Sequence, residues 1–191
     1  MHRRSQLFQR QPVWRPASAS KVSAPKAIRS WLEEPGSLTA RLRKAVGAGF
    51  GVRLLGQRWV RPFADEAALL ELPPRRRALV REVLLHCHGR PLVLARTVIP
   101  PHTLRGIYCG LAHLGNRPLG ELLFAYRGLQ RSHLEAAKAT QADWRHSIAR
   151  QFDIETPVWG RRSLYQVGRV SLTVCEFFLP SVLSLPELND E

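Results

Sequence analysis

The sequence predicts an α+β domain, a single antiparallel β-sheet flanked by helices. Three observations lead to this fold class: residues 30–47 show helical spacing of apolar residues, two pairs of strand-like segments are each joined by a short turn, and two helical segments lie between these pairs. The chain has 191 residues, 45% of them hydrophobic, which suits one domain with a buried core. We expect residues 29–191 to form this domain.

Residues 30–47 are predicted to form a helix, a turn and a second helix. Ser37 can cap the second helix, and Gly47 can end it. The apolar residues of that helix recur every four positions: Leu38, Leu42 and Val46. The next segment, FGVRLLGQRWVRPF, reads as a strand, and Pro62 favours a place at the edge of the sheet.

The segment ALVREVLLHCHGRPLVLARTVIP predicts a hairpin with strands at about 79–87 and 92–99. Side chains alternate between the two faces of a strand, so Arg81 shares a face with Leu79, Val83 and Leu85. Arg96 lies in the same way among the aliphatic residues of the returning strand. Two arginines are thus placed among apolar side chains.

The same patterns predict helices and strands in the second half of the chain. Residues 104–115 have helical spacing, and Pro118 opens a further helix whose amide groups at Leu119 and Gly120 could receive a carboxylate; an ordinary helix start facing solvent is the alternative. A strand is expected at 128–135, then a helix or loop. The segments RRSLYQV and VSLTVCEFFLP form a last hairpin, which puts Glu176 on an apolar face.

Buried charges are costly unless they are paired. A buried ion pair between Arg81 and Glu176 without any chemical role is one explanation of these residues. The other is a water-poor cavity in which guanidinium groups hold an anionic ligand and the carboxylate acts on it. The pattern alone leaves both open, and both make Glu176 important.

Composition and motifs narrow the class of protein. The formal charge is +14, and residues 1–30 hold seven Lys or Arg and no acid. We expect residues 1–28 to be a disordered basic tail, with an organellar transit peptide or a nucleic-acid-binding arm as alternatives. No apolar run approaches the ~20 residues of a membrane span. His86 and His88 share a strand face, but a third metal ligand is not evident, so a surface hairpin end is expected and no metal.

Six short motifs then carry a resemblance to a known family. PGSLTARL, REVLL, ARTVIP, LGNRPLGELLF, WGRRS and EFFLP follow one another at the separations found in chorismate pyruvate-lyase, the bacterial enzyme that makes 4-hydroxybenzoate for ubiquinone. The match covers about residues 30–181. The resemblance implies an antiparallel sheet with a ligand enclosed beneath helical flaps, and no cofactor.

The resemblance also implies roles for individual residues. Arg81 stands where the family binds the ring carboxylate, Leu119 where backbone is offered to the ligand, and Glu176 where the family has its glutamate. Leu38 stands where some members have a methionine near the ligand. By strand pattern, we expect Arg96 to balance the second carboxylate of the substrate. Glu176 would remove the ring proton as a general base, or hold the adjacent hydroxyl.

The expected ligands are chorismate and its product 4-hydroxybenzoate, in a cytoplasmic enzyme that acts as a monomer. A non-catalytic sensor of small aromatic acids is the main alternative, because the fold resembles the effector-binding domains of some bacterial regulators. Residues 1–29 are too short and too rich in proline for the helix-turn-helix that usually accompanies such a domain. Nucleic-acid binding through the basic tail is a third hypothesis, less well supported.

Overall fold

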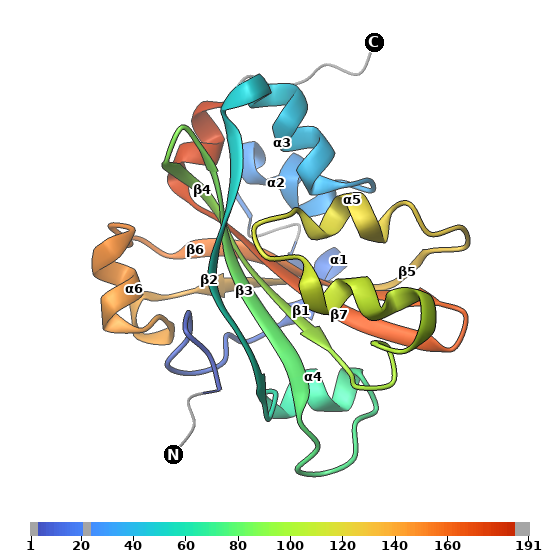
Figure 1. The fold of residues 1–191 in the computed structure, drawn as a ribbon. Helices are drawn as coiled ribbons and strands as arrows, with labels where there is room; N and C mark the ends of the chain where they lie inside the picture. Colours follow the sequence, from blue (N-terminus) through green and yellow to red (C-terminus); the bar gives the residue numbers. More distant parts are fainter. Residues whose placement is uncertain (1–3, 21–23, 186–191) are drawn as a thin grey trace.

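The computed structural model describes residues 4–20 and 24–185, and a strongly twisted antiparallel sheet forms the middle of this part of the chain (Figure 1). Its seven strands have the order β1-β5-β6-β7-β4-β3-β2. The strands are β1 (Arg15–Pro16), β2 (Phe50–Val60), β3 (Ala78–Cys87), β4 (Arg90–Ile99), β5 (Gln130–Ala139), β6 (Val158–Val167) and β7 (Val170–Phe178). The predicted α+β class is confirmed, and β2 lies at an edge as Pro62 indicated.

Helices cover both faces of this sheet. The α-helices are α1 (Ala17–Ser20), α2 (Lys26–Glu33), α3 (Leu38–Val46), α4 (Ala64–Leu69), α5 (Leu119–Leu123) and α6 (His146–Gln151). Short 3₁₀ segments are η1 (Gly47–Gly49), η2 (Gly106–His113), η3 (Gln141–Asp143) and η4 (Pro180–Ser184). Apolar residues of α2 and α3 pack on the face that presents Val83 and Leu85, whereas α6 packs on the face that presents Leu84 and Leu94. Each face therefore has its own hydrophobic core.

Several local predictions are confirmed in detail. Ser37 caps α3 by accepting a hydrogen bond from the amide of Ala40, and Gly47, at a φ of 59°, follows the last residue of that helix. Gly168, also at positive φ, forms the tight turn between β6 and β7. The helix expected at 104–115 is instead the 3₁₀ segment η2.

A β-bulge sets the register of the β3–β4 hairpin. Near the turn, Cys87 lies opposite Arg90, but the register shifts by one residue between Leu85 and His86. Beyond this shift Arg81 lies opposite Thr97, and Glu82 lies opposite Arg96. Because one residue of shift moves every side chain to the other face of a strand, Arg81 and Arg96 point to opposite faces of the sheet.

The expectation of a disordered tail over residues 1–28 is wrong for residues 4–20, while residues 1–3 and 21–23 lie outside the described residues. Leu7 and Phe8 are buried, and Phe8 stacks on Trp144 at a ring separation of 4.6 Å. The amide of Arg145 donates to the carbonyl of Leu7, and β1 pairs with β5. Buried apolar side chains and hydrogen bonds together hold this basic segment on the sheet.

Within the part of the chain that the structure describes, none of the helices has the length and apolar character needed to cross a membrane.

Candidate active site

Arg81 is a buried cation that lacks a carboxylate partner among the described residues. It lies on β3, is 2% exposed, and donates from Nη2 to the carbonyl oxygens of Gly115 (3.0 Å) and Arg117 (2.8 Å). Its Nε is buried without a hydrogen-bond partner in the described structure. Desolvation by burial lowers the pKa of Arg81 to about 10. An anion bound beside it would relieve this unfavourable burial.

Glu176 forms its ion pair with Arg161, not with Arg81. The two residues lie opposite each other on β6 and β7, and Arg161 Nε donates to Glu176 Oε2 at 2.6 Å. Arg161 is 1% exposed, and although burial lowers its pKa, the neighbouring Glu176 carboxylate raises it above the usual value. The suggested Arg81–Glu176 pair is therefore absent from the described structure, and the two charged side chains have different hydrogen-bond partners.

A cavity of about 40 Å³ lies between the sheet and the helices α3 and α5. Five of the predicted site residues line it: Arg81, Glu176, Leu38, Leu119 and Gly120. A water molecule needs about 10–15 Å³ of such volume, so the cavity has room for only a few waters. A larger ligand therefore needs part of the lining of the cavity to move.

The helices α3 and α5 close over this cavity from the same side (Figure 1). A methyl group added at Gly120 would lie 2.8 Å from Ser37 Oγ, which shows how closely the two helices approach. An ion pair between Arg43 of α3 and Glu121 of α5 also joins them at the surface. Both partners are largely exposed, so this pair contributes little energy and can open easily.

The expectation that Arg96 binds the substrate is wrong. Arg96 does not line the cavity; on the other face of the sheet its guanidinium donates to Glu66 (2.7 and 2.9 Å) and to Glu82 (2.8 Å). Glu82 also receives hydrogen bonds from the Ser5 hydroxyl and the amide of Gln6. The bulge, whose extra residue is Leu92 of β4, explains the error, since an unbroken hairpin would put Arg96 on the same face as Arg81.

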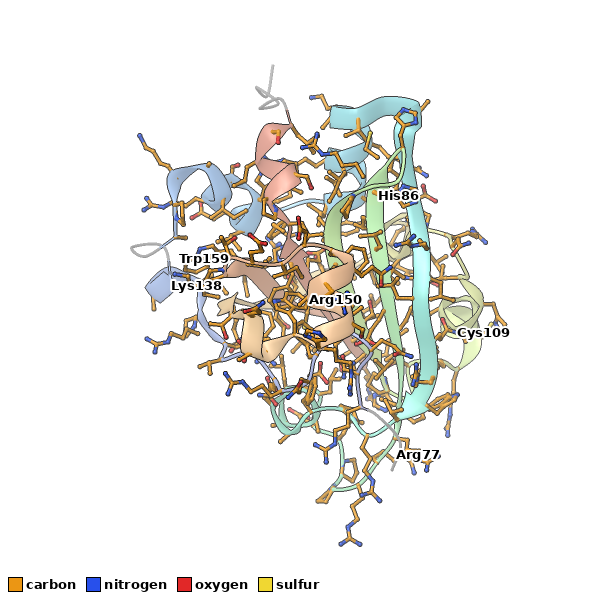
Figure 2. All side chains as sticks on the ribbon, turned by 90° about the vertical axis from the view of Figure 1, so that its left-hand side faces the viewer. Arg77, His86, Cys109, Lys138, Arg150 and Trp159 are labelled. Carbon is orange, nitrogen blue, oxygen red and sulfur yellow. The ribbon has the colours of Figure 1, made fainter. Side chains whose placement is uncertain are left out.

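The histidine and cysteine side chains of the described residues do not line this cavity. His86 is half-buried near the turn of the β3–β4 hairpin and His88 is exposed, whereas Cys109 is exposed on η2 (Figure 2). Across the residues described, no group of three His, Cys, Asp or Glu side chains could hold a metal ion. Burial raises the pKa of the Cys175 thiol well above its usual value, which makes it unreactive.

Comparison with known proteins then fixes the family. The family model described as chorismate lyase matches residues 8–185. The chain belongs to the chorismate lyase family. A probable chorismate pyruvate-lyase from Methylococcus capsulatus is 54% identical over 160 residues, which cover 84% of this chain and 99% of that protein. A second, from an Azoarcus species, is 42% identical over 171 residues, covering 86% and 90%.

Solved structures with the same fold come from another class of protein. The effector domain of PhnF from Mycobacterium smegmatis has a TM-score of 0.56 and 18% sequence identity, covering 76% of this chain and 90% of that domain. The ligand-binding domain of a putative GntR-family regulator from Bordetella bronchiseptica has a TM-score of 0.52 and 20% identity, covering 74% and 88%. At these identities the likeness shows a shared fold and nothing about activity. This chain therefore shares its architecture with the effector domain and the ligand-binding domain of these two proteins.

Sequence reasoning missed Arg161, although the WGRRS motif contains it. A two-residue turn at Gly168 and Arg169 sets Arg161 directly opposite Glu176 in an antiparallel hairpin. Strand alternation and this turn together could have found the pair. The carbonyls of Gly115 and Arg117, which hold Arg81 in place, lie on a loop that gives no such signal.

Proposed function

We propose that this chain is a chorismate pyruvate-lyase that eliminates pyruvate from chorismate and leaves 4-hydroxybenzoate, as the first committed step of ubiquinone biosynthesis in the cytoplasm. The family and the names of its relatives support the reaction. The observation that carries the proposal is a buried arginine with a vacant donor and no carboxylate partner in the described structure, at the wall of an enclosed cavity that also presents a glutamate. Residues 29–191 hold the proposed catalytic machinery.

Chorismate carries a ring carboxylate, an enolpyruvyl ether with a second carboxylate, and a hydroxyl on the adjacent ring carbon. Cleavage of the ether bond releases the enolpyruvyl group as pyruvate, and loss of the hydrogen from the carbon that bears the hydroxyl makes the ring aromatic. Aromatisation drives this elimination, so the protein has to orient the substrate and manage one proton.

In this proposal Arg81 anchors the ring carboxylate through the N–H of Nε, the donor left without a partner in the described structure, because both hydrogens of Nη2 already bond the carbonyls of Gly115 and Arg117. The backbone amides of Leu119 and Gly120, at the start of α5, assist it, and Leu38 closes the cavity from α3. Glu176 then lies near the ring hydroxyl. It acts there as a general base or as a hydrogen-bond acceptor that orients the substrate.

The test is to mix the purified protein with chorismate and to measure 4-hydroxybenzoate and pyruvate by chromatography. We expect equal amounts of both products, with strong losses in Arg81→Ala and Glu176→Gln. Glu135→Gln is a matched control, because Glu135 is also half-buried and paired with an arginine, Arg162. Protein that binds 4-hydroxybenzoate yet releases no pyruvate would instead support the sensor alternative.

A further inference from the structure

The contact between Arg161 and Glu176 uses only one of the two carboxylate oxygens. Arg161 Nε donates to Oε2, whereas Oε1 receives no hydrogen bond from the described residues. The Glu176 side chain is 13% exposed and lines the cavity. One oxygen is therefore fixed by the protein, and the other is left to a ligand.

The guanidinium of Arg161 is itself held firmly from another direction. Its Nη1 donates to the carbonyl oxygens of Trp31 (3.3 Å) and Glu34 (2.8 Å), at the end of α2. Carbonyls at the end of a helix lack partners within the helix and carry partial negative charge. Arg131 Nη1 donates to the same Glu34 carbonyl at 2.7 Å. Arg161 thus joins β6, on which it lies, to the turn that precedes α3, and α3 is one of the two helices that cover the cavity.

We propose that Arg161 is a positioning residue, which holds Oε2 of Glu176 and turns the other oxygen, Oε1, toward the substrate. This inference rests on the proposed lyase function. Because Arg161 occupies Oε2, Oε1 is the oxygen left to accept a hydrogen bond from the substrate hydroxyl. This geometry favours an orienting role for Glu176.

The charges around Glu176 support this assignment. Arg161 and Tyr165 face it from β6, Arg81 lines the same cavity from β3, and Arg131 and Glu34 lie behind Arg161. Burial raises the pKa of Tyr165, as does the nearby Glu176. The groups that face Glu176 are therefore cationic, apart from the neutral phenol of Tyr165. The acidic residue Glu34 contacts Arg161 through its backbone carbonyl. Loss of Arg161 would remove the only direct ion pair of Glu176 in the described structure.

The next residue along the chain provides a matched control. Arg162 is 4% exposed and points to the other face of the sheet, where it donates from Nε to Glu135 Oε2 at 2.7 Å and also pairs with Asp65. The two arginines share a strand, a degree of burial and the presence of carboxylate partners. They differ in that they point to opposite faces of the sheet.

The experiment compares Arg161→Gln, Arg161→Lys and Arg162→Gln in the full chain. For each variant we would record kcat and KM for chorismate, the affinities for 4-hydroxybenzoate and for benzoate, which lacks the hydroxyl, and thermal unfolding. Arg161→Gln should lower kcat about 100-fold, the size expected when a reacting group is misplaced by about 1 Å. It should also remove a preference of about tenfold for 4-hydroxybenzoate over benzoate, the size expected for a hydrogen bond to a charged group.

Arg161→Lys keeps the charge but not the planar fork. Its ammonium can still donate to Glu176, so it should recover part of the activity while kcat stays about tenfold below that of the parent. Arg162→Gln should lower the unfolding temperature and leave kcat, KM and the preference for 4-hydroxybenzoate unchanged.

Two results would overturn the inference: an Arg161→Gln protein whose only defect matches that of Arg162→Gln, or an Arg161→Lys protein with the full kcat of the parent. If Arg161→Gln does not fold, Arg161→Lys decides the question. A parent protein that makes no product would refute the lyase function alone, because the affinities for 4-hydroxybenzoate and benzoate are measured without turnover. An unchanged preference for 4-hydroxybenzoate in Arg161→Gln would then refute the role of Arg161.

Discussion

Replacing Arg81 by methionine should stabilise the fold and, at the same time, abolish binding of aromatic acids. Burial lowers the pKa of Arg81 from 12.5 to about 10. One pKa unit corresponds to about 1.4 kcal/mol, so burying this charge costs about 3 kcal/mol at neutral pH. Since the unfolded chain keeps the higher pKa, this penalty is complete below pH 10 and decreases as the pH rises above it.

The hydrogen bonds of Arg81 offset part of this cost. Its two bonds to the carbonyls of Gly115 and Arg117 contribute about 1–2 kcal/mol together. Both of these residues are exposed, so water can satisfy their carbonyls once the guanidinium is gone. We therefore expect Arg81→Met to raise the free energy of unfolding by about 1–2 kcal/mol.

Arg96→Met is the matched control for this change. Arg96 is as deeply buried as Arg81 and lies on the neighbouring strand, but it is paired with Glu66 and Glu82. Its loss would leave two buried carboxylates without a cation, which typically costs about 3–5 kcal/mol. The same substitution at two buried arginines on neighbouring strands should thus change the free energy of unfolding in opposite directions.

Urea and thermal unfolding at neutral pH measure both effects. For a chain of this size 1 kcal/mol moves the midpoint by about 2–4 °C, so Arg81→Met should melt about 2–8 °C higher than the parent. Adding 4-hydroxybenzoate should raise the melting temperature of the parent and leave that of Arg81→Met unchanged. An Arg81→Met protein that is less stable than the parent, or that keeps the ligand-induced shift, would refute the reasoning.

Three further changes test other parts of the molecule. Gly120→Ala should raise KM about tenfold in steady-state kinetics, because the new methyl would meet Ser37 Oγ at 2.8 Å, and an unchanged KM would contradict a tight closure of α3 on α5. Leu7→Ala should cost about 2–5 kcal/mol in urea unfolding, since Leu7 is fully buried; a loss below about 0.5 kcal/mol would mean that the N-terminal segment is only loosely attached. Asp143→Asn should destabilise the protein at neutral pH and not at about pH 2. Burial raises the pKa of Asp143, but the hydrogen bonds from its own turn and from Arg10 outweigh this effect and lower the pKa. The stabilisation by the carboxylate therefore disappears as acid protonates it. Equal destabilisation at both pH values would contradict that account.

The face on which a charged residue lies could be predicted from the sequence where the hairpin is regular. Alternation along β3 and β7 placed Arg81 and Glu176 correctly on cavity-facing surfaces, and both hairpins were found from their turns. These features depend on local sequence, because the period of a strand and the conformation of a tight turn are properties of a few consecutive residues. Their roles in binding or catalysis remain predictions.

Features that depend on long-range packing could not be predicted in this way. The bulge at Leu85 and His86 reverses the face of Arg96, and nothing in the local pattern requires it. The N-terminal segment looks polar and basic, yet Leu7 and Phe8 find a binding surface on residues far along the chain. The cavity volume depends on how closely two short helices approach, which strand and helix patterns do not report.

The attachment of the N-terminal segment also orders the events of synthesis. The amide of Gln9 donates to the carbonyl of Asp143, that of Arg145 donates to Leu7, and Phe8 stacks on Trp144. These partners, residues 143–145, lie far along the chain. During synthesis the segment therefore lacks these contacts until residues 143–145 have been added, so its native position depends on residues that are translated much later than its own.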